Sequence, residues 1–143
     1  MYKDLDLKII AELKKDGRAS LRTIAKRLGT STTTVAIRIR EMEESKLIRG
    51  FRPLLDYRQL GLGITAITLI KAMGGKIPIL MKDLMLDPQL THVYEITGEF
   101  DLMVIGKYKD TESMNREIKK LLSHKAIKET NTSIVLGTAR EEI

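Results

Sequence analysis

Two helices joined by a tight turn are predicted over residues 18–44, and this segment constrains the fold more than any other. Ser20 stands where an N-cap belongs, ahead of a short run with helical spacing of its apolar residues. Gly29 can adopt the left-handed conformation that ends such a helix. Ser31 caps the next helix, in which apolar residues recur at i, i+4 and i+7 from Val35. This pattern is typical of a helix-turn-helix that reads DNA.

The outer face of the second helix is short, polar and basic. Ile37 is placed to meet a thymine methyl group, and Arg40 to meet guanine or a phosphate. Other arginines of the two helices contact phosphates or hold the helices together. The DNA-binding residues predicted from this pattern are Arg22, Thr23, Arg27, Ser31, Thr32, Thr33, Ala36, Ile37, Arg38 and Arg40.

The net charge of the chain, +6, is concentrated in the same segment. Residues 1–58 hold 14 basic and 8 acidic side chains, whereas residues 59–143 hold 11 of each. Basic side chains can simply solvate helix surfaces. Together with the helical pattern, however, the excess positive charge indicates a polyanionic partner, double-stranded DNA.

Composition excludes several other classes of protein. The 143 residues contain no cysteine, which rules out a disulfide framework or a thiolate metal site. The charged start of the chain is not a signal peptide, and no apolar run is long enough to span a membrane, so we expect a cytoplasmic protein. His92 and His124 stand apart, and no set of residues suits catalysis or metal binding. We therefore expect neither an enzyme nor a cofactor.

A change of period after Gly61 and Gly63 marks a second domain. The order from there is strand, helix, strand, strand, helix, strand, with the last strand over residues 130–136 and a helix capped by Thr111. The predicted fold class is α+β, with an N-terminal (winged) helix-turn-helix domain and a C-terminal ferredoxin-like βαββαβ domain. The expected boundaries are 1–50 for the first domain, 51–61 for an extended linker and 62–143 for the second domain.

The strands of this second domain are apolar on both faces. Residues 102–105 are apolar without interruption, as are residues 134–136, and Ile67, Leu69 and Ile70 are apolar in the first strand. An antiparallel sheet covered by helices on one side should alternate apolar and polar residues. Short apolar runs are common in small domains, but a dimeric DNA reader is also expected on geometric grounds. We therefore predict that a second copy of the chain covers the open face.

Residues 6–51 resemble the DNA-binding half of the Lrp/AsnC (feast/famine) transcription regulators. The Asp16-Gly17-Arg18 run, the Ile24-Ala25 pair and Arg38 fall at the spacing of that family. The segment ITGEFDLMVIG, residues 96–106, resembles the family's Gly-x-x-Asp signature between two strands. The resemblance extends over essentially the whole chain. One departure is Ser45-Lys46 after the third helix, where the family usually has glycine.

The resemblance implies a homodimer built by the C-terminal domains, often assembled further into octamers, and a small-molecule effector, usually an amino acid. Backbone N–H groups around Gly98 could donate hydrogen bonds to the ligand carboxylate, and Asp101 could pair with its ammonium group. Gly98 and Asp101 could equally be simple turn formers. The effector-binding residues predicted on this basis are Gly98, Glu99, Phe100, Asp101, Thr130 and Thr132.

The function predicted from the sequence is a sequence-specific DNA-binding transcription regulator whose assembly or DNA binding responds to an amino acid. An architectural protein that wraps or compacts DNA is the alternative, because the same basic helix would serve it. An enzyme on the βαββαβ domain is a third class, but no nucleophile or base supports it.

Overall fold

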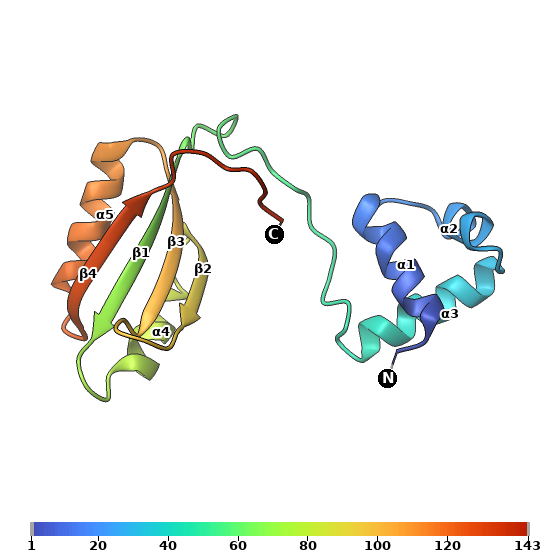
Figure 1. The fold of residues 1–143 in the computed structure, drawn as a ribbon, viewed down its shortest axis with the longest axis horizontal. Helices are drawn as coiled ribbons and strands as arrows, with labels where there is room; N and C mark the ends of the chain where they lie inside the picture. Colours follow the sequence, from blue (N-terminus) through green and yellow to red (C-terminus); the bar gives the residue numbers. More distant parts are fainter. Residues whose placement is uncertain (1, 143) are drawn as a thin grey trace. The chain divides into compact units, whose positions relative to one another are not determined.

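The computed structural model describes residues 2–142 and divides the chain into two compact units, with the boundary in the sequence between Pro53 and Leu54. The first unit is helical, and the second combines a sheet with two helices (Figure 1). Within residues 2–142, no helix is both long enough and apolar enough to cross a bilayer.

Three helices form the first unit around a small apolar core. Ile9, Ile24, Val35 and Met42 are its buried centre, with 0 to 1% of each residue exposed. Each helix contributes an apolar stripe to this core, and no helix could bury that stripe alone. The helices are α1 (Asp4–Lys15), α2 (Leu21–Leu28) and α3 (Thr32–Glu44).

The end of α3 is closed by a lysine in a left-handed conformation. Lys46 has φ of 62°, and the N–H of Ile48 then donates to the carbonyl of Met42 at 3.0 Å. Glycine is the usual residue at this position of a helix C-terminus because it has no Cβ. Residues 49–56 that follow are exposed and belong to no helix or strand. No strand lies between residues 2 and 63, so this unit is a helix-turn-helix without a wing.

The second unit is a four-stranded antiparallel sheet with two helices, which confirms the predicted ferredoxin-like arrangement. The strand order is β2-β3-β1-β4, and both helices are crossover connections. The elements are β1 (Ile64–Ala72), α4 (Ile77–Leu84), β2 (Leu90–Glu95), β3 (Leu102–Tyr108), α5 (Thr111–Ser123) and β4 (Ile127–Ile134).

Two predicted boundaries were wrong. The last strand begins at Ile127 rather than at residue 130 and ends at Ile134, because an edge strand can hold the exposed Lys128 and Glu129. The cap of α5 is Asp110, whose carboxylate accepts from the N–H of Ser113 at 2.7 Å, and not Thr111.

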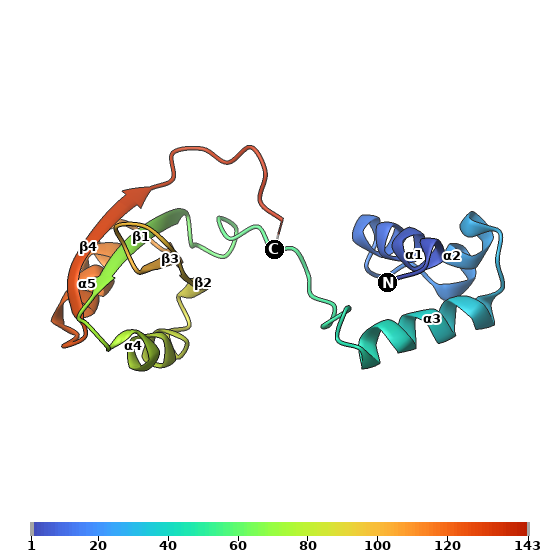
Figure 2. The same cartoon turned by 60° about the horizontal axis from the view of Figure 1, so that its bottom comes forward.

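Both helices lie on one face of the sheet (Figures 1 and 2). Ile70, Leu102 and Val104 are buried beneath them, with 0 to 1% of each exposed. Gly106 on the same face leaves room for the ring of Tyr108, since a Cβ there would collide with that ring and its hydroxyl. Burial raises the pKa of Tyr108 to about 12.

The other face of the sheet carries apolar side chains that no helix covers. Ile67 and Ile105 are directly opposed in the β1–β3 register, as are Leu69 and Met103, and all four are half-buried. The alternation of β3 thus sends Val104 to the helices and Ile105 to the open face.

Candidate nucleic-acid interface and ligand site

The turn between α2 and α3 is fixed by local hydrogen bonds. The Ser20 hydroxyl accepts from the N–H of Thr23 at 3.0 Å, and the Ser31 hydroxyl accepts from the N–H of Thr34 at 3.1 Å. Gly29 has φ of 66°, the left-handed conformation expected at the end of α2. These contacts set the angle at which α3 leaves the turn, and therefore which of its faces points outward.

The outward face of α3 is open to a partner. The side chain of Arg40 is 72% exposed, and Ile37 is 43% exposed although it is a large apolar residue. Thr33 is exposed and Ala36 half-buried on the same face. Arg40 Nε lies 3.8 Å from a Glu44 carboxylate oxygen, a surface pair of little energetic weight. This face has the size and polarity to enter a DNA groove.

Arg38 faces the interior of the unit and holds α3 against α1. Its Nε donates to Asp6 Oδ1 at 2.7 Å and its Nη2 to Asp6 Oδ2 at 2.5 Å. Asp6 is fully buried and also accepts from the N–H of Lys3 at 3.0 Å. The Arg38 hydrogen bonds hold the pKa of Asp6 below its usual value, against the opposing effect of burial. The side chain of Arg38 is 17% exposed, and its guanidinium is held within the unit by Asp6.

A second cation, Arg27, ties α2 to α1. Its Nη1 donates to Glu12 Oε2 at 2.9 Å, and Lys15 holds the other oxygen of Glu12 at 3.0 Å. The hydrogen bonds from these two partners lower the pKa of Glu12, and the one from Arg27 has the larger effect. The side chain of Arg27 is 53% exposed, so it retains an outer edge that a phosphate could reach.

The remaining predicted DNA-binding residues lie at the start of the two helices. Arg22, Ser31 and Thr32 are exposed, and Thr23 is half-buried. The hydroxyls of Ser20 and Thr23 lie 2.8 Å apart, within the cap of α2. All ten predicted residues therefore lie on α2, α3 and the turn. Two of them also form ion pairs within the unit, Arg38 with Asp6 and Arg27 with Glu12.

The candidate effector turn joins β2 to β3 and is anchored to the end of β1. Gly98 has φ of 109°, a conformation that disfavours other residues. Asp101 Oδ2 accepts from the N–H of Ala72 at 2.7 Å, and the N–H of Asp101 donates to the carbonyl of Ile70 at 2.9 Å. Glu99 is exposed beside it. One carboxylate oxygen of Asp101 thus already serves the turn.

The two predicted threonines of the last strand are not equally close to this turn. Thr130 is paired with Ile70, which in turn faces Leu102, so Thr130 lies at the same end of the sheet as Asp101, with β1 between them. Thr132 lies farther along β4, and its hydroxyl is 3.0 Å from that of Thr68. Phe100 is half-buried within the turn.

Sequence reasoning did not find the partners of the buried charges. Nothing in the sequence links Asp6, near the start of α1, to Arg38. Lys107 is a buried cation on β3, 4% exposed, bonded to Glu141 at 2.7 Å. Its only sequence signal is a lysine inside the otherwise apolar strand that ends at Tyr108. Within residues 2–142, no three His, Asp or Glu side chains gather as metal ligands.

Comparison with family models matches both units. Residues 4–43 match the AsnC-type helix-turn-helix domain, and residues 65–142 match the Lrp/AsnC ligand binding domain. Among curated relatives, an uncharacterized HTH-type transcriptional regulator of Pyrococcus abyssi is 43% identical over 142 residues, covering 99% of this chain and 97% of that protein. The HTH-type transcriptional regulator FL11 of Pyrococcus horikoshii is 36% identical over 138 residues, covering 96% of this chain and 91% of that protein.

Solved structures share the fold at lower identity. AsnC of E. coli superposes with a TM-score of 0.92 at 23% identity, covering 100% of this chain and 97% of that one. A transcriptional regulator of Neisseria meningitidis in complex with L-methionine superposes with a TM-score of 0.91 at 21% identity, covering 99% of this chain and 94% of that one.

Proposed function

Because this chain belongs to the Lrp/AsnC family of DNA-binding transcription regulators, we propose that it recognises specific operators through the outer face of α3 and responds to an amino acid. The family's function is regulation of transcription rather than catalysis. The proposal concerns which residues read the DNA, how the copies assemble, and where the effector binds.

The observation that supports DNA reading by α3 is that its side chains point to two different faces, one internal and one outward. Arg38 is held by the buried Asp6, whereas Arg40 and Ile37 project from the opposite face. An exposed isoleucine beside an exposed guanidinium is poorly explained by solubility, since it leaves apolar surface in water. In a major groove, Ile37 would contact a thymine methyl and Arg40 a guanine edge.

Replacement of Arg40 tests this directly. An operator is first selected from random DNA with the full-length protein, and Arg40→Ala is then compared with Arg116→Ala, an exposed arginine of α5. If Arg40 reads a base, its loss weakens operator binding by roughly 1–3 kcal/mol and relaxes one position of the site. Arg116→Ala should leave both unchanged. Equal weakening on all DNA sequences would make Arg40 a phosphate contact and contradict its proposed role.

Self-association through the open face of the sheet is part of the same proposal. Ile67, Leu69, Met103 and Ile105 form a continuous apolar patch that no helix covers. An isologous contact between two such patches would bury it and place two α3 helices in one assembly. Paired recognition helices are what an operator with two half-sites requires.

A second apolar surface supports assembly beyond the dimer. Met85 and Leu86 at the end of α4 are 74% and 79% exposed, and Ile79 on the same helix is 55% exposed. These residues are on the helical side of the unit, opposite to the open face. A contact between dimers there would leave the dimer contact intact.

The turn at residues 98–101 is the proposed effector site. Asp101 keeps one carboxylate oxygen for a ligand ammonium group while the other holds the N–H of Ala72. The Neisseria regulator bound to L-methionine supports an amino acid as the kind of ligand. The turn belongs to the sheet unit and not to the helical unit, so a ligand there acts by favouring one assembly over another, by its differential affinity for the two.

A further inference from the structure

Lys107 is a cation buried on the face of the sheet that the helices do not cover. It is directly opposite Thr65 in the β1–β3 register and lies on the same face as Ile105, yet only 4% of the residue is exposed. Its cover therefore comes from outside the regular elements of the fold. Burial of an ammonium group is expensive unless the group is paired, so the residues around Lys107 Nζ have to supply its partners.

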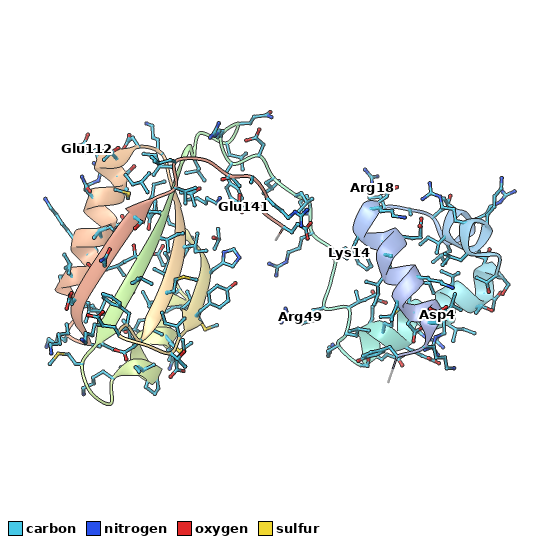
Figure 3. All side chains as sticks on the ribbon, in the orientation of Figure 1. Asp4, Lys14, Arg18, Arg49, Glu112 and Glu141 are labelled. Atoms are coloured by element: carbon cyan, nitrogen blue, oxygen red, sulfur yellow. The ribbon has the colours of Figure 1, made fainter. Side chains whose placement is uncertain are left out.

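Three segments meet at the Lys107 ammonium group. Nζ donates to Thr65 Oγ1 at 3.0 Å and to Glu141 Oε1 at 2.7 Å. It also lies 5.0 Å from the centre of the Tyr57 ring, within the range of a cation–π contact. Tyr57 belongs to the segment that precedes β1. Glu141 belongs to the tail that follows β4 and is labelled in Figure 3. In Figures 1 and 2 the tail leaves β4 at the end of the sheet where the linker enters β1.

We propose that Lys107, Tyr57 and Glu141 form a clasp that sets the length of the tether carrying the DNA-binding unit, and hence the half-site separation that the protein accepts. The segment from Tyr57 to Leu62 is folded back on itself, with the N–H of Leu62 donating to the carbonyl of Tyr57 at 2.8 Å. On the other side, Leu47 and Ile48 pack on the core of the first unit. With the clasp closed, the free tether is therefore residues 49–56.

The reach of this tether changes greatly when the clasp opens. Eight extended residues span at most roughly 28 Å, whereas the stretch 49–63, about fifteen residues, spans roughly 50 Å. Each unit of a dimer would gain roughly 20 Å, so that two units together exceed one turn of DNA, about 34–36 Å. The effective concentration of the second unit would fall roughly threefold, since it scales as about the −3/2 power of tether length.

Glu141→Gln is the sharpest way to open the clasp, because it removes one charge and keeps the side-chain shape. The Lys107 ammonium, left without its carboxylate, has to reach water, and the cover of linker and tail must move to allow this. Lys107→Met is a second route that leaves no buried charge. Glu142→Gln is the matched control, since Glu142 lies beside Arg140 on the surface, at 4.0 Å, and outside the clasp.

A proteolysis assay on the full chain tests the clasp without DNA. Trypsin can cut after Arg49, in the free tether, and after Arg58, inside the clasped segment. We expect wild type and Glu142→Gln to be cut after Arg49 at least roughly tenfold faster than after Arg58, because cleavage of the latter needs local opening. Glu141→Gln and Lys107→Met should bring the two rates close together. Equal rates in the wild type would overturn the clasp.

A DNA-binding assay tests whether the clasp limits the half-site separation. This test rests on the proposed operator recognition by a dimer. The probes are the selected operator and the same duplex with 10 bp inserted between its half-sites. The insertion should reduce the affinity of the wild type by roughly 100-fold, because both units can no longer bind at once. It should reduce the affinity of Glu141→Gln by less than roughly tenfold. Affinity for an isolated half-site should not change. An identical insertion penalty in both proteins refutes the tether role, whereas a wild type indifferent to half-site pairing refutes dimeric operator recognition itself.

Discussion

Asp6→Asn should strongly destabilise the DNA-binding unit, although the substitution changes only one atom. Asp6 is fully buried and holds Arg38 through two hydrogen bonds of 2.5 and 2.7 Å. Removing one partner of a buried pair typically costs about 3–5 kcal/mol. Arg38 keeps Glu41 as a partner and 17% exposure, which places the expected loss at the lower end, about 3 kcal/mol.

Asp4→Asn is the control, because it is the same substitution in the same helical turn. Asp4 pairs with Lys8 on the surface, where the side chains are 80% and 59% exposed, and such pairs contribute at most about 0.5 kcal/mol. Amide hydrogen exchange on the full chain is the assay, because it separates the two units. A loss of about 3 kcal/mol predicts roughly 100-fold less protection in α1 and α3 and no change in the sheet.

Acid provides an independent check on the same pair. Because the folded-state pKa of Asp6 lies below its unfolded value, the pair contributes stability that is present above roughly pH 4 and is lost as the pH falls through the folded-state pKa. The difference between wild type and Asp6→Asn should therefore be full at pH 7 and shrink in strong acid. If Asp6→Asn stays within about 0.5 kcal/mol of Asp4→Asn at pH 7, the reasoning from burial is wrong.

Four other changes probe the remaining parts of the account. Lys46→Gly should stabilise the helical unit by about 0.5–1 kcal/mol in thermal unfolding, because it relieves a left-handed residue at some cost in unfolded-state entropy; a loss of stability would contradict this. Gly106→Ala should destabilise the sheet unit by about 1–3 kcal/mol, since the new Cβ meets Tyr108; a neutral effect would show that the ring can move. Ile105→Lys should give monomers by light scattering, and an unchanged mass would exclude the open face as the dimer contact. Asp101→Asn should weaken amino-acid binding in calorimetry yet spare operator affinity, and unchanged ligand affinity would remove Asp101 from the site.

Local signals in the sequence were sufficient for the helix-turn-helix. Ser20, Gly29 and Ser31 act within four residues of themselves, and the structure confirms each of them as a cap or a helix end. The N-cap of α5 was predicted wrongly because two neighbouring residues were both suited to that position. Asp110 and Thr111 are both good caps, and the carboxylate was the one that bonded to the N–H of Ser113.

Long-range partners could not be predicted from one sequence. Asp6 and Arg38 are 32 residues apart, and Lys107 and Glu141 are 34 apart, in segments with no shared pattern. Helical spacing alone does not separate Leu121 from Leu122 on α5, yet Leu121 packs against the core whereas Leu122 is 51% exposed. What a buried charge pairs with depends on tertiary packing, and only the structure supplies it.

The most direct test of whether α3 reads base edges is the preference for the operator over other DNA, measured at several salt concentrations. The full chain is titrated onto its selected operator and onto a scrambled duplex of the same length and composition, over a series of salt concentrations. If α3 reads base edges, the operator should bind at least roughly 10³-fold more tightly at physiological salt, and this ratio should persist as phosphate contacts weaken. Equal affinities that fall together with salt would instead show an architectural protein held by phosphates alone.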